Sequence, residues 1–546
     1  MILAVIPARG DSKGIPRKNV RLLNGKPLLY YAIKHATECP LIDDVAVTSD
    51  DEEILSIARR HGVRAIQRAG ELALDTVTLD PVIYDALTWM EQEKGTVYDV
   101  VVTLQPTSPL LSVQTLSHAL EDFVQSSYDT YISVVNKPHL SWSVGSGGGY
   151  KQDYEKRQNR QQLPPRYEET GAFLIARRKC ISPGSRIGKK VSVYEMPKQE
   201  AVDIDDVSDW LICEQELKKK KILFRADGYK QIGMGHIYHC LTLAYNLIGH
   251  EIVFVTKKEH QEGLRKLEEA HMKVKAVIND REYLCFVREW KPDIVVNDCL
   301  DTQEDFVKEL KKYVKRVVAI EDLGSGADCA DVVINALYED GKRGRSYYWG
   351  EKYVCLKDEF FMAKPAVFHK EVRRVVVVFG GTDASGFTGR VYTLAKRLHK
   401  DYPRIIFHFI LGIGYSCTDG VIGEEIEEGI CVERDTRRIS DAFMQADLAF
   451  TSQGRTVYEL ASVGVPAIVM AQNERETKHT FAQMHNGFMN LGLGKYVSDE
   501  TLERTFRWLV ETPQIRREMR ELMLRHDLTK GIDRVRQLIL KEDENE

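Results

Sequence analysis

Short unbroken runs of apolar residues alternate along the chain with segments in which apolar positions recur three and four residues apart. The first pattern is typical of strands buried on both faces of a parallel sheet, and the second of helices covering such a sheet. Their alternation predicts βα units and a doubly wound α/β fold. The first predicted strands span residues 2–6, 44–49, 62–66, 99–104 and 131–135, and the helices span 28–37, 52–61, 80–93 and 207–216.

The pattern starts afresh after a run of lysines at 218–221. A new first strand is predicted at 222–227, and the alternation begins a third time after residue 370. Further strands are predicted at 293–297, 316–320, 331–335, 374–379, 447–450 and 465–470, with a helix at 241–247. We therefore expect a Rossmann-like domain at 1–217, a linker at 218–221, and two further Rossmann-like lobes at 222–370 and 371–546.

Composition excludes several classes of protein. A chain of 546 residues is too long for one core, and its net charge of -5 gives no electrostatic case for nucleic-acid binding. No apolar run approaches the roughly 20 residues that span a bilayer, and Met1 leads directly into a strand rather than a signal peptide. The ten cysteines form no Cys-x-x-Cys pair, which favours free thiols in a reducing compartment. We expect a cytoplasmic protein that binds neither membrane nor nucleic acid.

The loop after the first strand combines small residues with positive charge. It contains Gly10, Gly14 and Ser12, and the cations Arg9, Lys13, Arg17 and Lys18. Glycine lets backbone N–H groups approach phosphate oxygens, and the cations neutralise their charge. The loop is neither a Walker motif nor Gly-x-Gly-x-x-Gly. It predicts a phosphate site at the carboxyl end of a first parallel strand, the alternative being an ordinary charged surface loop.

Residues 6–19, Ile-Pro-Ala-Arg-Gly-Asp-Ser-Lys-Gly-Ile-Pro-Arg-Lys-Asn, closely resemble the nucleotide loop of the CMP-sialic acid synthetases, the acylneuraminate and pseudaminic acid cytidylyltransferases. Asp11 stands where that family has a second glycine. The resemblance implies a GT-A-like domain that binds CTP, with Arg9 and Lys13 catalytic. The implied nucleotide-binding residues of this loop are Ala8, Arg9, Gly10, Ser12, Lys13, Arg17, Lys18 and Asn19.

Residues 105–109, Gln-Pro-Thr-Ser-Pro, follow the predicted strand 99–104. By the topology of doubly wound sheets they lie beside the first loop. A proline-rich turn in which Thr107 or Ser108 caps the next helix is the alternative. The family resemblance implies that Gln105, Thr107 and Ser108 lie by the cytosine and ribose.

Asp203 and Asp205 are two residues apart in an extended segment, so both carboxylates face one side. Paired carboxylates beside a triphosphate suit Mg²⁺, although an acidic turn before helix 207–216 is the alternative. The segment matches the family's Asp-Ile-Asp, which implies a metal site with Asp203 also catalytic. In the implied reaction, a hydroxyl of a nonulosonic acid attacks the α-phosphate of CTP and diphosphate leaves. Transfer of another nucleotide to a sugar phosphate is the competing reaction.

Arg160, Gln161 and Gln162 lie in a polar stretch that resembles the family segment covering the acidic sugar. In the family this segment also helps to build a dimer, so the resemblance implies a homodimer through the N-terminal domain. Thr170-Gly171 stands where the family has Asn-Gly before a strand.

The second half carries two glycine loops at predicted strand-to-helix turns. Gly233, Gly235 and His236 form the first, and Gly380 with Gly381 ends a later strand. In the last lobe, a diphosphate is expected on the N–H groups near Ser452 and Gly454, and Glu459 within reach of a ribose. Two Rossmann-like lobes with the nucleotide in the second define the GT-B architecture.

Residues 224–240, together with Gly-Gly-Thr-Asp at 380–383 and the segment 452–466, resemble a GT-B family. It is the UDP-2,4-diacetamido-2,4,6-trideoxy-β-L-altropyranose hydrolases, which are related to MurG-type glycosyltransferases. The resemblance implies that a UDP-sugar binds and that His236 handles the attacking water, whereas His239 is expected to be a plain helix residue.

Two positions depart from this hydrolase family. Cys299-Leu300 replaces His-Tyr, and Tyr458 replaces Asn before the ribose-binding glutamate. The resemblance implies that the C-terminal half is a hydrolase. The departures leave three alternatives: hydrolysis of a different sugar nucleotide, a glycosyltransferase, or an inactive nucleotide-sugar-binding module. A chain that combines both halves would serve nonulosonic acid biosynthesis.

Overall fold

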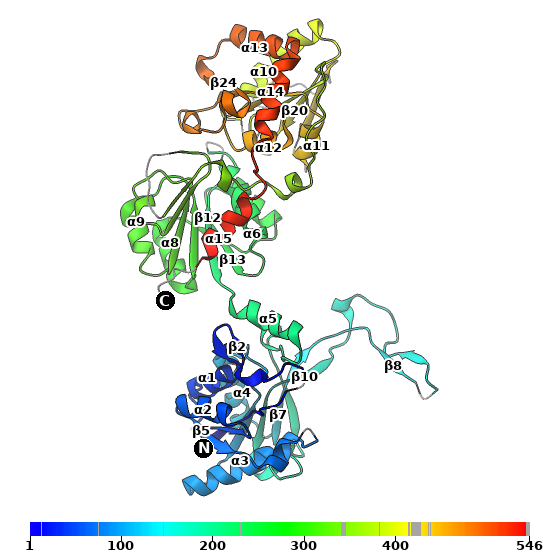
Figure 1. Ribbon diagram of the computed structural model, residues 1–546, viewed down its shortest axis with the longest axis vertical. Helices are drawn as coiled ribbons and strands as arrows, with labels where there is room; N and C mark the ends of the chain where they lie inside the picture. The colour runs from blue at the N-terminus through cyan, green and yellow to red at the C-terminus, as the bar shows by residue number, and fades with distance from the viewer. Residues whose placement is uncertain are drawn as a thin grey trace. The chain divides into compact units, whose positions relative to one another are not determined.

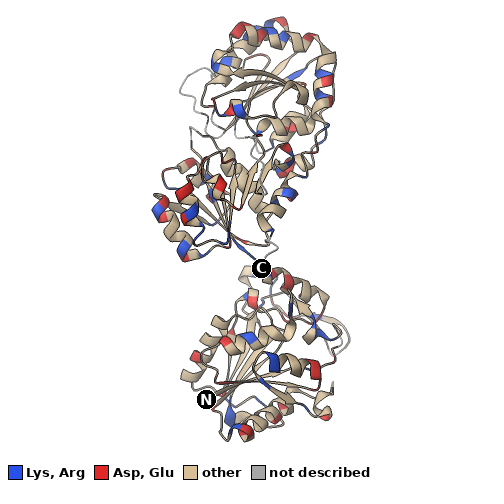
Figure 2. Ribbon diagram, turned by 60° about the vertical axis from the view of Figure 1, so that its left-hand side comes forward, with Lys and Arg blue, Asp and Glu red and all other residues tan. Residues whose placement is uncertain are grey.

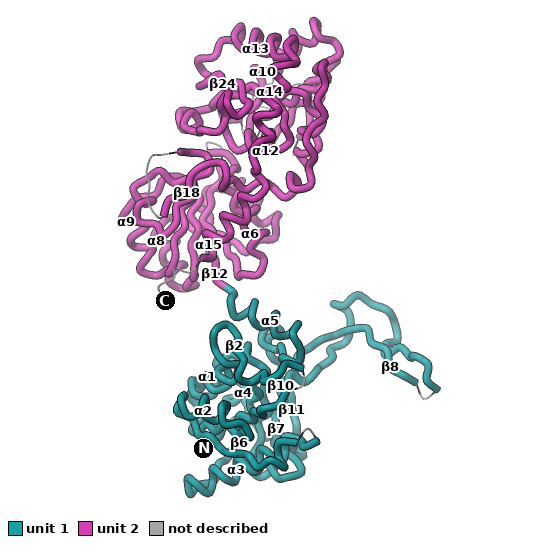
Figure 3. Tube along the Cα trace, viewed as in Figure 1, with its two compact units in different colours: residues 1–219 teal, residues 220–546 magenta. Residues whose placement is uncertain are grey.

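The structure is a computed structural model that divides into two compact units, Met1–Lys219 and Lys220–Glu546 (Figure 3). The division falls inside 218–221, the segment expected to be a linker. The structure describes residues 1–541 except 13, 75, 146, 230–231, 340–345, 382, 413–414, 416–426, 435 and 437.

Unit 1 is built on a seven-stranded sheet in the order β11-β7-β10-β6-β1-β4-β5 (Figure 1). All neighbours are parallel except β10, which runs antiparallel to both β6 and β7. The strands are β1 (Ile2–Pro7), β4 (Asp44–Ser49), β5 (Arg64–Gln67), β6 (Val100–Leu104), β7 (Thr130–Asn136), β10 (Tyr167–Arg177) and β11 (Val191–Glu195). The helices are α1 (Leu28–Glu38), α2 (Glu52–Arg60), α3 (Leu79–Lys94), α4 (Val113–Gln125) and α5 (Val207–Leu217).

Strand β1 shows why the first apolar run is unbroken. Ile2, Ala4 and Ile6 pack with helices α1, α2 and α4 in one core, whereas Leu3 and Val5 pack with α3 in another. Successive side chains of a strand point to opposite faces, so a strand covered on both sides needs apolar residues at every position.

A hairpin arm interrupts unit 1 between β7 and β10. Its strands β8 (Trp142–Val144) and β9 (Tyr150–Gln152) pair antiparallel, and Figure 1 shows them standing away from the main sheet. The side chains of Trp142, Val144 and Tyr150 are 56%, 70% and 81% exposed. The arm therefore presents apolar surface that unit 1 itself does not cover.

Unit 2 contains two all-parallel sheets, β14-β13-β12-β15-β16-β17-β18 in an N-lobe and β21-β20-β19-β22-β23-β24 in a C-lobe. In each lobe the first strand is central and the chain winds outwards in both directions. This order is Rossmann-like, and it confirms the expected fold class. The N-lobe strands are β12 (Lys221–Ala226), β13 (Glu251–Lys257), β14 (Val274–Val277), β15 (Ile294–Asp298), β16 (Arg316–Ile320), β17 (Val332–Asn335) and β18 (Tyr347–Trp349). The C-lobe strands are β19 (Arg374–Val378), β20 (Ile406–Leu411), β21 (Ile430–Arg434), β22 (Leu448–Ser452), β23 (Ala467–Ala471) and β24 (Phe488–Leu493).

The helices of unit 2 show two differences from expectation. Helix α6 begins at Gly235 rather than at residue 241, because Ile237, Cys240, Leu241 and Ala244 already form one buried face. Helix α15 packs Ile532, Val535 and Ile539 into the N-lobe core, so 371–546 is not entirely C-lobe. The helices are α6 (Gly235–Tyr245), α7 (Gln261–Glu269), α8 (Asp280–Trp290), α9 (Glu304–Leu310), α10 (Phe387–Asp401), α11 (Ile439–Met444), α12 (Thr456–Val463), α13 (Asp499–Glu511), α14 (Pro513–Met523) and α15 (Gly531–Leu540).

Basic and acidic residues are interspersed along the outer helices of each unit (Figure 2). None of the helices in the described part of the chain has the length and apolarity that crossing a bilayer requires.

Candidate active sites

Three segments far apart in sequence converge at the carboxyl edge of the unit 1 sheet. The main chain of Ile204 joins them: its N–H donates to the carbonyl oxygen of Thr107 (2.8 Å), and its carbonyl oxygen accepts a hydrogen bond from the Lys18 ammonium. A Cβ on Gly14 would lie 2.1 Å from the carbonyl oxygen of Asp205. Only glycine allows the loop to approach this closely.

Several predicted phosphate-binding residues hold the shape of the loop itself. The Asn19 side-chain amide donates to the carbonyl oxygen of Arg9 (2.9 Å), and the N–H of buried Ala8 donates to Thr48 (3.1 Å). The N–H of Gly10 donates to the carboxylate of Asp50 (3.1 Å). These described residues of the loop are therefore held in place by hydrogen bonds within unit 1.

The remaining loop residues differ in their surroundings. Arg17, which has a left-handed backbone (φ 56°), pairs with Asp51 (3.3 Å) and Glu53 (2.5 Å) at the start of α2. Ser12 is half-buried, and Lys13 lies outside the described residues. Arg17 and Lys18 both interact with other groups of the protein, so their positive charges are already partly compensated within the fold.

The second loop and the paired aspartates bring polar atoms together. A Cβ on Gly171 would lie 3.0 Å from Asp203 Oδ2 and 3.3 Å from Gln105 Nε2, so these two side chains flank the same glycine. Among the described residues, Thr107 Oγ1, Ser108 Oγ and Asp203 Oδ1 are buried and lack a well-formed hydrogen bond. Unsatisfied buried oxygens are uncommon in folded proteins, and such a group suits a polar ligand.

Asp203 and Asp205 fit a magnesium ion. Burial raises the pKa of Asp203, with a smaller opposing effect of the Thr107 hydroxyl. Its buried Oδ1, which lacks a well-formed hydrogen bond to a described residue, and the exposed carboxylate of Asp205 are the hard oxygen ligands that Mg²⁺ prefers.

The predicted sugar-binding residues stand apart from these three segments. Arg160, Gln161 and Gln162 form a short exposed 3₁₀ turn on the chain that returns from the arm. Within the described ranges, their side chains make no hydrogen bond or ion pair. Unit 1 by itself therefore does not bring them to the phosphate loop.

In unit 2, Asp298 joins two histidines. This wholly buried residue ends β15 and lies 2.5 Å from His236 Nδ1 and 2.7 Å from His239 Nδ1. Burial alone would raise the pKa of Asp298, but both histidines hold it below its usual range. Burial lowers the pKa of His239 to about 4. The ionised carboxylate favours the proton on Nδ1 of His236, which leaves the Nε2 lone pair available.

Asp298 was not among the site residues predicted from the sequence, and His239 was expected to be a plain helix residue. Asp298 could have been found from the sequence, because it is an acidic residue at the carboxyl end of a predicted parallel strand. Ligand sites of parallel sheets lie at that edge.

A second buried charged pair connects the two lobes of unit 2. Arg455 Nη2 lies 3.5 Å from Glu321 Oε1, and burial raises the pKa of Glu321 to about 7. Both Nη atoms of Arg455 lack a hydrogen bond to any described residue. The pair itself was not anticipated: Arg455 lies in the glycine loop expected to receive a diphosphate through its backbone, whereas Glu321 belongs to no recognised motif and lies far away in sequence.

The C-lobe places its predicted residues around the start of α12. A Cβ on Gly381 would lie 3.5 Å from Met234, so the loop of Gly380 and Gly381 meets the loop of Gly233 and Gly235. Buried Ser452 ends β22 and lies next to Gly454. Glu459 forms an ion pair with Lys357 (3.2 Å).

Tyr458, one of the two departures from the hydrolase pattern, serves packing. Its hydroxyl donates to the carbonyl oxygen of Ala336 (2.8 Å), and its ring stacks on Phe481 with centroids 4.3 Å apart. The side chain therefore joins the lobes rather than facing a nucleotide.

Unit 1 thus combines a phosphate-type loop, a polar second loop and paired carboxylates, an arrangement of the nucleotidyltransferase class. The family model described as cytidylyltransferase matches residues 3–231. The pseudaminic acid cytidylyltransferase of Campylobacter jejuni is 32% identical over 232 residues, which cover 41% of this chain and 97% of that protein. The chain therefore belongs to the cytidylyltransferase family.

For some other similar proteins, the matched region covers a smaller share of the relative's own length. The N-acylneuraminate cytidylyltransferase A of Danio rerio is 32% identical over 222 residues, which cover 40% of this chain and 50% of that protein. The chain spans between 50% and 66% of the length of four such curated relatives. Among solved structures, MurG of Acinetobacter baumannii aligns over 59% of this chain and 99% of its own, with 16% identity and a TM-score of 0.43.

Proposed function

We propose that unit 1 transfers the cytidylyl group of CTP to a nonulosonic acid. The observation that carries this proposal is the convergence of the phosphate loop, the segment 105–108 and Asp203 at one sheet edge. The proposal is also supported by similarity to proteins named as pseudaminic acid and N-acylneuraminate cytidylyltransferases.

In the proposed reaction, a hydroxyl oxygen of the sugar acid bonds to the α-phosphorus of CTP. The bond from that phosphorus to the bridging oxygen breaks, and diphosphate leaves with its electron pair. Arg9, Lys13 and the backbone N–H groups of the loop stabilise the departing charge. Asp203 and Asp205 would hold Mg²⁺, which supplies further charge neutralisation at the phosphate oxygens. Gln105, Thr107 and Ser108 would orient the cytidine.

The exposed arm supports a homodimer through unit 1. A second copy would cover Trp142, Val144 and Tyr150, and would bring residues 160–162 to the acidic sugar. Sedimentation of the full chain and of the double variant W142S/Y150S tests this. A dimeric wild-type chain and a monomeric double variant would support the proposal, whereas a monomeric wild-type chain would contradict it.

The test of unit 1 is diphosphate release from CTP and Mg²⁺ with sialic, legionaminic and pseudaminic acids and Kdo. We expect release with one of these acids, and slower release by Asp203→Asn at the same Mg²⁺ concentration. No release with any of them would overturn the proposal. A sugar 1-phosphate assayed with each nucleoside triphosphate tests the competing reaction.

For unit 2, we propose hydrolysis of a UDP-sugar, supported chiefly by the contact of His236 with Asp298 (2.5 Å). Water attacks C1 of the sugar and gives its proton to Nε2 of His236, while the bond from C1 to the phosphate oxygen breaks and UDP leaves. Asp298 holds the imidazole in the required tautomer, and the N–H groups at the start of α12 would receive the diphosphate.

Glycosyl transfer is the second candidate, because a polar pocket in the N-lobe is lined by Cys299, the residue that follows Asp298. UDP release from UDP-N-acetylglucosamine and related UDP-sugars, with and without added monosaccharides, separates the two. Release with water alone supports the hydrolase, and release only with an added sugar supports the transferase. UDP-sugar binding without release would identify a binding module.

A further inference from the structure

Arg455 extends from the C-lobe of unit 2 to the N-lobe. It directly precedes α12, and its Nη2 lies 3.5 Å from Oε1 of Glu321, which follows strand β16 of the N-lobe. Burial alone would lower the pKa of Arg455, but the carboxylates of Glu321 and Asp298 raise it above its ordinary value. The guanidinium is therefore charged and acts electrostatically on the proposed catalytic pair of His236 and Asp298.

Glu321 is held in place from several sides. Its backbone is left-handed (φ 54°), and its side chain is only 2% exposed. Its Oε1 accepts a hydrogen bond from the N–H of Ala336 (3.2 Å), and its carbonyl oxygen accepts one from Arg475 Nη2 (2.9 Å). A left-handed backbone at a residue other than glycine persists only where the surroundings hold it. The position of Glu321 is therefore set before Arg455 is considered.

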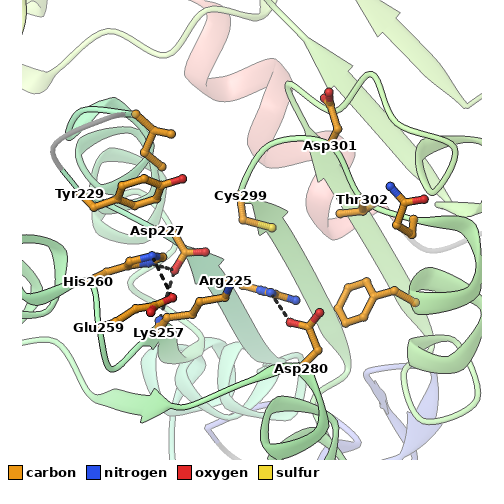
Figure 4. A pocket seen from close by; sticks show the side chains of 13 residues that line it. Arg225, Asp227, Tyr229, Lys257, Glu259, His260, Asp280, Cys299, Asp301 and Thr302 are labelled. Atoms are coloured by element: carbon orange, nitrogen blue, oxygen red, sulfur yellow. Dashed lines mark hydrogen bonds and ion pairs between the residues drawn. The ribbon is translucent and has the colours of Figure 1, made fainter. Parts of the chain in front are cut away.

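Arg475 also holds the two lobes of unit 2 together at this edge. Its Nη1 and Nη2 each lie 2.9 Å from a carboxylate oxygen of Asp301 in the N-lobe. Asp301 and Cys299, which follows Asp298, line a pocket of about 580 Å³ (Figure 4). A bidentate arginine–carboxylate contact fixes geometry as well as adding energy. The approach of Arg455 to the N-lobe is therefore supported by a second contact between the lobes.

The guanidinium of Arg455 has hydrogen-bonding capacity that the fold does not use. The side chain is 20% exposed, but both Nη atoms are buried and lack a hydrogen bond to any residue in the described part of the chain. Buried donors of this kind are uncommon in folded proteins. A guanidinium presents its N–H groups in a planar fork that matches two oxygens of a phosphate. The unused donors therefore suit a phosphate group between the start of α12 and His236.

We propose that Arg455 is a catalytic residue of unit 2 that stabilises the negative charge of the departing diphosphate, and that Glu321 is its positioning residue. The proposal rests on the proposed cleavage of a UDP-sugar. When the bond from C1 to the phosphate oxygen breaks, that oxygen keeps the electron pair and becomes a terminal oxygen of UDP. Arg455 donates hydrogen bonds to the oxygens of this phosphate and transfers no proton. The same group departs if a sugar hydroxyl replaces water as the acceptor.

Four variants separate the contributions. R455Q removes the charge, and R455K keeps the charge but not the planar fork. Because R455Q leaves Glu321 buried without its partner, it may not fold stably, so the double variant E321Q/R455Q removes both charges at nearly constant size. R404Q is the control, since it removes a positive charge from an exposed position of the C-lobe.

Binding is tested without turnover. The full chain is titrated with UDP, and hydrogen exchange in peptides from α12 locates the binding in the C-lobe. We expect the affinity for UDP to fall about tenfold in R455Q and E321Q/R455Q, to fall less in R455K, and to stay unchanged in R404Q, because only the first two lose every charge-assisted hydrogen bond of this side chain. The proposal is overturned if E321Q/R455Q binds UDP as tightly as the wild type. It is also overturned if neither UDP nor inorganic diphosphate protects α12 in the wild type.

The rate of UDP-sugar cleavage tests the catalytic role. We expect kcat to fall by roughly 10²- to 10³-fold in R455Q, the usual effect of losing a donor to a developing negative charge. E321Q should lower kcat about tenfold in the wild type and cause no further loss in the R455Q background, because it acts through Arg455. If the two effects multiply instead, Glu321 only supports the fold and the positioning role is wrong.

The two proposals for unit 2 fail in different ways. Normal cleavage by E321Q/R455Q would overturn the catalytic role of Arg455 and leave the hydrolase standing. If the wild type cleaves no UDP-sugar, with water or with an added sugar, while R455Q still weakens UDP binding, the proposed function and the catalytic role are both overturned. Arg455 would then be a phosphate-binding residue only.

Discussion

The ammonium group of Lys18 donates a hydrogen bond to the carbonyl oxygen of Ile204, across 186 residues of sequence. Lys18 is buried, and its partner lies between the two aspartates proposed to bind magnesium. This contact ties the phosphate loop to the metal segment.

Replacing Lys18 by methionine keeps the aliphatic stem but removes this donor. We expect the free energy of unfolding of unit 1 to fall by roughly 2 kcal/mol, because the buried carbonyl of Ile204 loses a charge-assisted partner. Urea-dependent hydrogen exchange of β1 peptides measures this. Lys34→Met, at an exposed position of α1, is the matched control. Equal stability of the two variants would contradict the structural role of Lys18.

Asp203→Asn should raise the Mg²⁺ concentration needed for half-maximal diphosphate release by at least about tenfold. The substitution removes the negative charge while retaining size. Magnesium titrations at saturating CTP measure the effect, and the exposed Asp122→Asn on α4 serves as control. An unchanged magnesium requirement would remove Asp203 from the metal site.

Asp298→Asn should lower UDP-sugar hydrolysis by roughly 10²- to 10⁴-fold, because a neutral amide no longer enforces one tautomer of His236. The ¹⁵N NMR shifts of the imidazole report which nitrogen carries the proton, and they should change along with the rate. Asp305→Asn, exposed on α9, should alter neither. A slower enzyme with unchanged imidazole shifts would indicate a general structural defect instead.

Tyr458→Phe should destabilise unit 2 by about 1 kcal/mol, the cost of losing the hydrogen bond to Ala336. Tyr458→Ala should cost about 4 kcal/mol, because it also leaves a cavity beside Phe481. Hydrogen exchange of β23 peptides in urea measures both. Tyr245→Phe, exposed at the end of α6, should have no effect. If Tyr458→Ala changed nucleotide affinity but not stability, the packing role would be wrong.

His35 should make unit 1 sensitive to acid. Burial in α1 lowers the pKa of His35 to about 4, with a smaller contribution from Lys34. An unfolded histidine has a pKa of about 6.5, so the unfolded chain takes up a proton that the folded unit rejects. The contribution of His35 to stability is therefore complete above pH 6.5 and is lost as pH falls towards 4.

The expected loss is about 3 kcal/mol between pH 7.5 and pH 4. Unfolding measured across this range should show a weaker acid dependence in His35→Leu than in the wild type. His118→Leu, at an exposed position on α4, should keep the wild-type dependence. Parallel pH curves for the wild type and His35→Leu would refute the prediction.

The sequence by itself determined the strands and helices in which the pattern of buried positions repeats over a few neighbouring residues. Strand β1 and strand β16 (Arg316–Ile320) were readable because a strand covered on both faces is apolar at every position. The glycine loops at 10–14 and 233–235 were readable because a close backbone approach requires a missing side chain. These features depend on a few neighbouring residues.

Only the tertiary structure decided which distant residues meet. Asp298 accepts from two histidines about 60 residues earlier, Lys18 reaches Ile204, and α15 returns to the N-lobe. Strand β10 lies antiparallel between β6 and β7. Local periodicity shows that one face of a helix or strand is buried, but it does not show which other element covers that face. The partner is set by long-range packing and by the pairing of buried polar groups, which no single segment encodes.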